Sequence, residues 1–100
     1  MSVHFIVSLE PQPGREAEFR VALRQVLEPT RAEPGCLSIR AFESIREPLV
    51  FTIHSEWMDE AAFDHHAQLP HTLRFLGAAE QCLTHPVQGL RLRESEVNSF

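Results

Sequence analysis

Apolar residues along this chain follow two spacings, one typical of strands and one typical of helices. The segments 3–10, 36–44, 49–57 and 87–96 are short and rich in Val, Ile, Leu and Phe, as buried strands are. Segment 15–31 instead carries apolar residues at positions i, i+3, i+4, i+7 and i+8, which is the period of an amphipathic helix. The pattern therefore predicts four strands, with a long helix between the first two.

Two shorter helices are predicted between the third and fourth strands. Asp59 is a suitable N-cap for a helix that runs through Ala67, and Pro70 suits the first turn of a helix that runs to about Leu83. Pro29 is expected to kink or end the long helix because proline lacks a backbone N–H. The resulting order β-α-β-β-α-α-β predicts an α+β fold of the ferredoxin-like kind with an antiparallel sheet.

The first predicted strand is apolar on both faces, since Val3, Phe5, Ile6, Val7 and Leu9 all lie in it. Helices of the same chain can cover one face, and the other face needs a partner sheet. The chain of 100 residues forms a single domain, 1–100, and a chain this short buries only about two-thirds of its unfolded surface. We therefore expect a homodimer that associates through the open sheet face.

Composition and charge narrow the class of partner. Nine basic and fourteen acidic residues give a formal charge of −5, which argues against nucleic acid or an anionic membrane as the main partner. No apolar run approaches the roughly 20 residues of a membrane span, and the N-terminal segment lacks the features of a signal peptide. We expect a soluble, cytoplasmic protein.

Six histidines are the main candidates for chemistry because imidazole exchanges protons near neutral pH. His66 shares one face of its predicted helix with Ala62, Phe63 and Ala67, so it should point into the protein, whereas His65 should face solvent. His66 then either lies in a cavity or is a core histidine bonded to a backbone carbonyl.

His71, near the start of the next helix, either closes the same cavity or caps the turn. Residues five apart on one helix point about 140° apart, so the spacing of His66 and His71 is not that of a metal-binding pair. A loop at 69–70 lies between them and permits convergence, but no H-E-x-x-H motif is present. We expect no metal.

Trp57 shares a strand face with Phe51, Ile53 and Ser55, by period-two alternation. It is either a core tryptophan or the wall of a pocket, where its ring would stack on an aromatic ligand and its indole N–H would donate a hydrogen bond. Arg74 has three possible roles: it reaches such a pocket, it reaches the dimer interface, or it is solvated or salt-bridged.

Three segments together carry a family resemblance. They are PGREAEFR, TRAEPGCL and the spacing W-x8-H-x4-H-x3-F, which joins Trp57, His66, His71 and Phe75. In these motifs the chain resembles the antibiotic-biosynthesis monooxygenase family. The resemblance implies a dimeric α+β barrel, in which two ferredoxin-like subunits associate face to face and each has a pocket between sheet and helices. Oxygenases of this family use neither metal nor flavin, so the resemblance implies no cofactor.

By position, Trp57, His66 and His71 match the recurrent tryptophan and helix histidines of that family. The aromatic oxygenases in it carry an asparagine where Ile53 stands and a tyrosine where Phe63 stands, so this chain departs from them in two polar groups. Its haem-degrading branch carries a tryptophan at the position of His66, which argues against haem degradation here.

The resemblance and the histidines together predict a cofactor-independent monooxygenase that acts on a quinol or hydroxylated aromatic with O2. We expect His66 to accept a proton and His71 to relay it or orient a neighbour. The residues expected to contact the substrate are aromatic or flank the pocket, namely Trp57, Phe51, Ile53, Phe63, Phe75 and Arg74. The alternatives are an isomerase or lyase on a small oxygenated metabolite, and a non-catalytic dimeric module that binds a small ligand.

Overall fold

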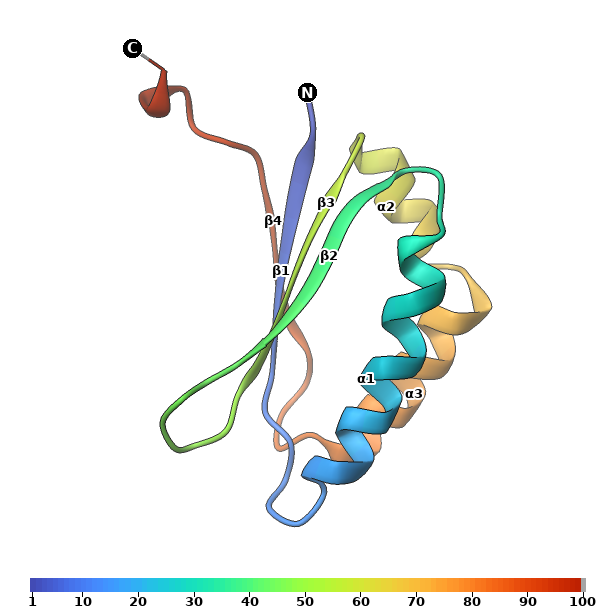
Figure 1. Cartoon of the computed structure of the whole chain (residues 1–100), viewed down its shortest axis with the longest axis vertical. Helices are drawn as coiled ribbons and strands as arrows, with labels where there is room; N and C mark the ends of the chain where they lie inside the picture. Colours follow the sequence, from blue (N-terminus) through green and yellow to red (C-terminus); the bar gives the residue numbers. More distant parts are fainter. Residues whose placement is uncertain (100) are drawn as a thin grey trace.

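The computed structural model of the chain describes residues 1–99, which form a sheet with three helices on one of its faces (Figure 1). The elements are β1 (Val3–Leu9), α1 (Glu16–Arg31), β2 (Cys36–Glu43), β3 (Phe51–Trp57), α2 (Glu60–His66), α3 (Pro70–Cys82), β4 (Gln88–Leu92) and a 3-10 turn, η1 (Glu96–Asn98). The four strands are antiparallel in the order β2-β3-β1-β4. This order confirms the predicted ferredoxin-like α+β fold.

The core lies between the sheet and the helix pair α1 and α3. β3 alternates strictly, with Phe51, Ile53, Ser55 and Trp57 buried toward the helices and the residues between them only partly buried. Phe19 of α1 is fully buried against this face, and its ring lies 4.9 Å from that of Phe51. The predicted alternation of the third strand is therefore confirmed.

Helix starts follow the predicted signals. The Asp59 carboxylate accepts a hydrogen bond of 2.8 Å from the Ala62 N–H, and Pro70 occupies the first turn of α3. α1 continues through Pro29 to Arg31, so this proline does not end the helix. Only two helical residues follow it.

The last strand is shorter than predicted, since β4 ends at Leu92 and not at Glu96. β4 pairs only with β1, and its register places Leu92 opposite His4, one residue from the start of β1 at Val3. Beyond that point the chain has no neighbouring strand to accept its hydrogen bonds. The prediction that residues 93–96 continue the last strand was therefore wrong.

The loop between α1 and β2 makes a very close contact with α2. A Cβ atom added to Gly35 would overlap the Cβ of Ala62, and the Gly35 carbonyl accepts a 2.9 Å hydrogen bond from the Met58 N–H. Only glycine permits this approach. The contact holds the loop that carries Glu33 against the helix that carries His66.

The second face of the sheet is uncovered in the single chain. Phe42, Leu90 and Leu92 are 47%, 61% and 37% exposed, and their register places them on the face away from the helices. His4 of β1 and His54 of β3, the two central strands, lie on the same face, with His4 Nδ1 and His54 Nε2 3.0 Å apart. Within residues 1–99, no helix has the length and apolar character needed to cross a membrane.

The Gly35 contact gives a stability prediction. Gly35→Ala should lower the free energy of unfolding by about 1–3 kcal/mol, because the added methyl group forces α2 away from the loop. Gly77→Ala is the matched control: a methyl group added there would have no atom within 4 Å, and a helical alanine should stabilise by about 0.5–1 kcal/mol. Urea unfolding measures both variants. An unchanged midpoint for Gly35→Ala would show that the loop and α2 are not held together by this contact.

Candidate functional site

A cavity of about 280 Å³ lies between the sheet and the helices. Its walls are mostly apolar, and the polar side chains among its lining residues are few. The lining comprises Phe5, Val7, Val26, Thr30, Ile39, Ile53, Ser55, Phe63, His66, Ala67, Thr72, Phe75, Leu76, Val87, Gly89, Leu90 and Arg91. An apolar cavity with a few polar groups is the usual form of a small-molecule site.

His66 belongs to a cluster of three side chains centred on Glu33. The Glu33 Oε2 atom lies 2.7 Å from His66 Nδ1 and 2.7 Å from His71 Nε2. The side chain of Glu33 is 8% exposed, and those of His66 and His71 are 11% and 15% exposed. A buried carboxylate without such partners would be costly, so the two imidazoles stabilise Glu33 in this position.

The cluster determines which nitrogen of His66 carries hydrogen. An ionised carboxylate can only accept, so His66 donates from Nδ1 to Glu33 at 2.7 Å, and the Thr72 hydroxyl oxygen, 3.2 Å from the same nitrogen, is the weaker acceptor of that hydrogen. Nε2 of His66 has no hydrogen-bond partner among residues 1–99. Every fully buried side-chain nitrogen or oxygen in that range does have a hydrogen-bond partner, so Nε2 is not fully buried. Nε2 therefore has open surface, and the ring lines the cavity. The result is an oriented imidazole with a free lone pair, which can act as a base.

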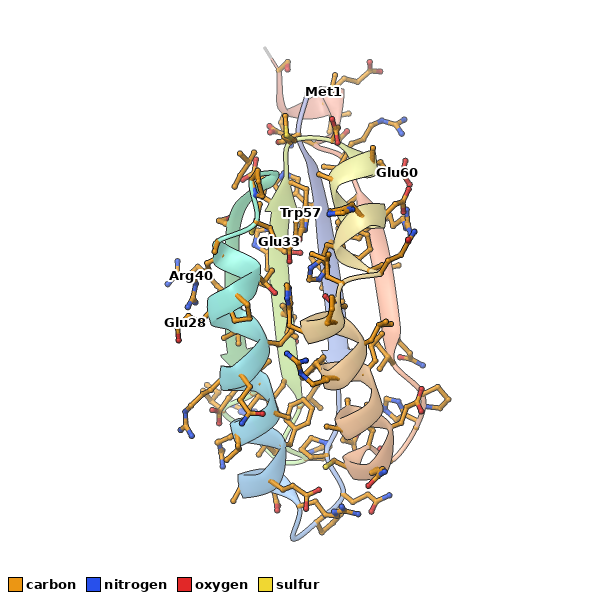
Figure 2. All side chains as sticks on the ribbon, turned by 90° about the vertical axis from the view of Figure 1, so that its right-hand side faces the viewer. Met1, Glu28, Glu33, Arg40, Trp57 and Glu60 are labelled. Atoms are coloured by element: carbon orange, nitrogen blue, oxygen red, sulfur yellow. The ribbon has the colours of Figure 1, made fainter. Side chains whose placement is uncertain are left out.

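Trp57 packs against the His66 ring without lining the cavity. It is fully buried, its ring centroid lies 4.7 Å from that of His66, and its indole N–H donates a 2.9 Å hydrogen bond to Ser55 Oγ. Figure 2 shows Glu33 and Trp57 in the space between α1 and α2. His66 contacts both of these side chains. Trp57 does not line the cavity itself.

The rim of the cavity is built from aromatic rings and one arginine. Phe63 stacks on Phe5, with centroids 3.5 Å apart, and the Arg91 guanidinium lies 5.2 Å from each ring. Arg91 donates to Glu60 and Asp64 of α2, at 2.7 and 3.0 Å. The hydrogen bond to Glu60, and then that to Asp64, raises the pKa of Arg91 above its ordinary value.

The structure separates the predicted site residues into two groups. His66, Ile53, Phe63 and Phe75 line the cavity, whereas the other predicted residues do not. Phe51 is buried beside Phe19, and Trp57 lies one layer behind His66. His71 and Arg74 lie in a separate groove between α1 and α3, which Phe75 also borders.

The sequence prediction missed Glu33, the residue that joins the two histidines. It stands in the TRAEPGCL motif, directly before the Pro34-Gly35 turn. Its contacts reach 33 and 38 residues along the chain, so no local spacing indicates them. An acidic residue beside an apolar turn was the available signal, because a buried carboxylate needs donors.

Three ligand atoms for an ion are present in the same cluster. Glu33, His66 and His71 each offer one, and these atoms lie within 4.8 Å of one another. Two imidazoles and a carboxylate are a donor set that Zn²⁺ and Fe²⁺ accept. The contacts of 2.7 Å to Glu33 have the length of charge-assisted hydrogen bonds.

A protein-family model described as antibiotic biosynthesis monooxygenase matches residues 2–78. The chain belongs to this family. Rv0793 of Mycobacterium tuberculosis is 31% identical over 85% of this chain and 83% of its own length. YcnE of Bacillus subtilis is 27% identical over 88% of this chain and 93% of its own length. The names of both relatives carry a provisional monooxygenase assignment. The chain spans 55% of the length of another relative, the uncharacterised protein sll1783 of Synechocystis, at 30% identity.

Two solved structures share the fold of this chain. The structure of Rv0793 superposes with a TM-score of 0.89 and 28% identity, covering 95% of this chain and 96% of that one. SnoaB of Streptomyces nogalater, described as a cofactor-independent oxygenase, has a TM-score of 0.82 and 17% identity over 93% of this chain and 92% of its own. At that identity the likeness to SnoaB shows the fold alone.

Proposed function

We propose that this family member is a cofactor-independent monooxygenase that oxidises a small quinol or hydroxylated aromatic with O2. The observation that supports it most is the 2.7 Å hydrogen bond from His66 Nδ1 to Glu33, which leaves Nε2 free on a ring that lines an apolar cavity. A base in such a place can remove a phenolic proton where water is scarce.

The proton transfer begins at the substrate hydroxyl. His66 Nε2 accepts its proton, and the imidazolium that forms is stabilised by the carboxylate of Glu33. The second imidazole, His71, donates to the same oxygen and is partly exposed in the groove between α1 and α3. Glu33 and His71 thus provide a route from the cavity toward solvent.

The electrons come from the substrate in this proposal. The deprotonated ring passes one electron to O2, and the two radicals combine to form a carbon–oxygen bond. The peroxide then loses water: its O–O bond breaks, the carbon loses its hydrogen as a proton and becomes a carbonyl, and the departing oxygen takes up both this proton and the proton held by His66. One oxygen atom of O2 remains in the product and the other leaves as water.

The cavity favours a substrate with one or two rings. Its volume of about 280 Å³ is just below the lower end of the range for ligand pockets, which is about 300–1,000 Å³. The apolar walls formed by Ile53, Phe63 and Phe75 suit a flat aromatic ring.

Oxygen consumption tests the proposed activity. Chelator-treated protein should consume O2 with a panel of one- and two-ring quinols faster than their spontaneous oxidation. His66→Ala should lower kcat by about 10²–10⁴-fold, the usual contribution of a positioned base. His65→Ala is the matched control on the same helix, where the side chain is exposed, and it should keep full activity.

Other outcomes of that experiment contradict the proposal. Activity that is lost on chelation and restored by a metal ion would assign the Glu33 cluster to an ion. Turnover without O2 would indicate an isomerase or lyase, and ligand binding without turnover would indicate a binding module.

We also propose that the protein is a homodimer through the open sheet face. Exposed Phe42, Leu90 and Leu92 on that face support it, because a sheet face that exposes several large apolar side chains is commonly covered by a partner. Light scattering at micromolar concentration should give twice the 11.4 kDa chain mass. Phe42→Asp should shift the protein toward monomer, whereas Leu73→Asp should not, since Leu73 is 55% exposed on α3. A stable wild-type monomer would contradict this proposal.

A further inference from the structure

The Ser55 hydroxyl has an unused hydrogen in the cavity. The indole nitrogen of Trp57 can only donate, so Ser55 Oγ is the acceptor of their 2.9 Å hydrogen bond. A hydroxyl also carries one hydrogen of its own, and within residues 1–99 that hydrogen has no acceptor. Ser55 is 4% exposed and lines the cavity. A buried donor that is held by a neighbour and lacks an acceptor is suited to a ligand oxygen.

Ser55 and His66 lie around the same tryptophan. Ser55 is bonded to the Trp57 indole, and the His66 ring packs 4.7 Å from it between centroids. Both side chains line the cavity, where their neighbours Ile53 and Phe63 are apolar. Ser55 thus gives the cavity a free donor, and His66 gives it a free acceptor.

We propose that Ser55 and His66 form a subsite for the hydroxyl oxygen of an aromatic ligand. The ligand O–H donates to His66 Nε2 while its oxygen accepts from the Ser55 hydroxyl. After the proton moves to His66, the oxyanion accepts hydrogen bonds from both groups. Ser55 is therefore a substrate-positioning residue that selects phenols and quinols over rings without a hydroxyl group. The subsite rests on the proposed function for the role of His66.

The preference is explained by hydrogen bonding. A ring without a hydroxyl leaves both polar groups unpaired, and buried polar groups without partners weaken binding strongly. The hydrogen bond from Trp57 restricts rotation of Ser55, so its hydrogen is oriented before the ligand enters.

Binding of 4-nitrophenol and nitrobenzene tests the subsite in the absence of O2. The two ligands differ only in the hydroxyl, and the absorption of 4-nitrophenol reports its ionisation. Wild type should bind 4-nitrophenol at least about tenfold more tightly and increase its ionised fraction relative to free solution, as expected for a hydrogen-bonded anion. Ser55→Ala should weaken 4-nitrophenol binding about tenfold and leave nitrobenzene binding unchanged. Ser55→Thr, which keeps the hydroxyl, should retain the preference.

Several outcomes would overturn the subsite. Equal weakening of both ligands in Ser55→Ala would assign Ser55 a structural role through Trp57, and unchanged 4-nitrophenol binding would show that Ser55 does not contact the ligand. Failure of the wild type to bind 4-nitrophenol at millimolar concentration would also contradict it.

The two proposals fail in different ways. A phenol preference that depends on Ser55, without O2 consumption on any quinol, would retain the subsite and remove the oxygenase. Quinol oxidation with unaltered kcat/KM in Ser55→Ala would retain the oxygenase and remove the subsite.

Discussion

The site depends on one buried carboxylate. Glu33 Oε2 accepts hydrogen bonds of 2.7 Å from both His66 and His71, and the three side chains are at most 15% exposed. Because the carboxylate can only accept, it determines which His66 nitrogen carries hydrogen. The free nitrogen of His66, its place at the cavity and its suitability as a base all follow from this interaction.

The fold brings Glu33 to His66 through a close backbone contact. Gly35 lies against Ala62, so the loop after α1 and the helix α2 meet without an intervening side chain. Trp57 ends β3 behind His66, and the turn before Pro70 places His71 on the other side of the carboxylate. Two of the family motifs, TRAEPGCL and the spacing W-x8-H-x4-H-x3-F, therefore meet at the Glu33 cluster.

Local patterns were enough to predict most of the fold. The alternation in β3, the apolar period in α1 and the cap at Asp59 are set by neighbouring residues, and all three are confirmed. The end of β4 depends on where β1 offers a partner, which the segment 87–96 does not encode by itself. Alternation placed Phe51 and Trp57 on the correct face of the sheet. It does not tell how deep a residue lies, and both are covered by other side chains. Glu33 was missed because its partners are distant in sequence.

The tautomer of His66 is the most direct test of this account. Two-dimensional ¹H–¹⁵N NMR of labelled protein near neutral pH distinguishes a protonated from a bare ring nitrogen. The hydrogen bond to Glu33 predicts that the neutral form of His66 carries its hydrogen on Nδ1 and is bare at Nε2, and Glu33→Ala should remove this preference. A His66 that carries its hydrogen on Nε2 in the wild-type protein would contradict the account, because the cavity would then face a donor instead of a base.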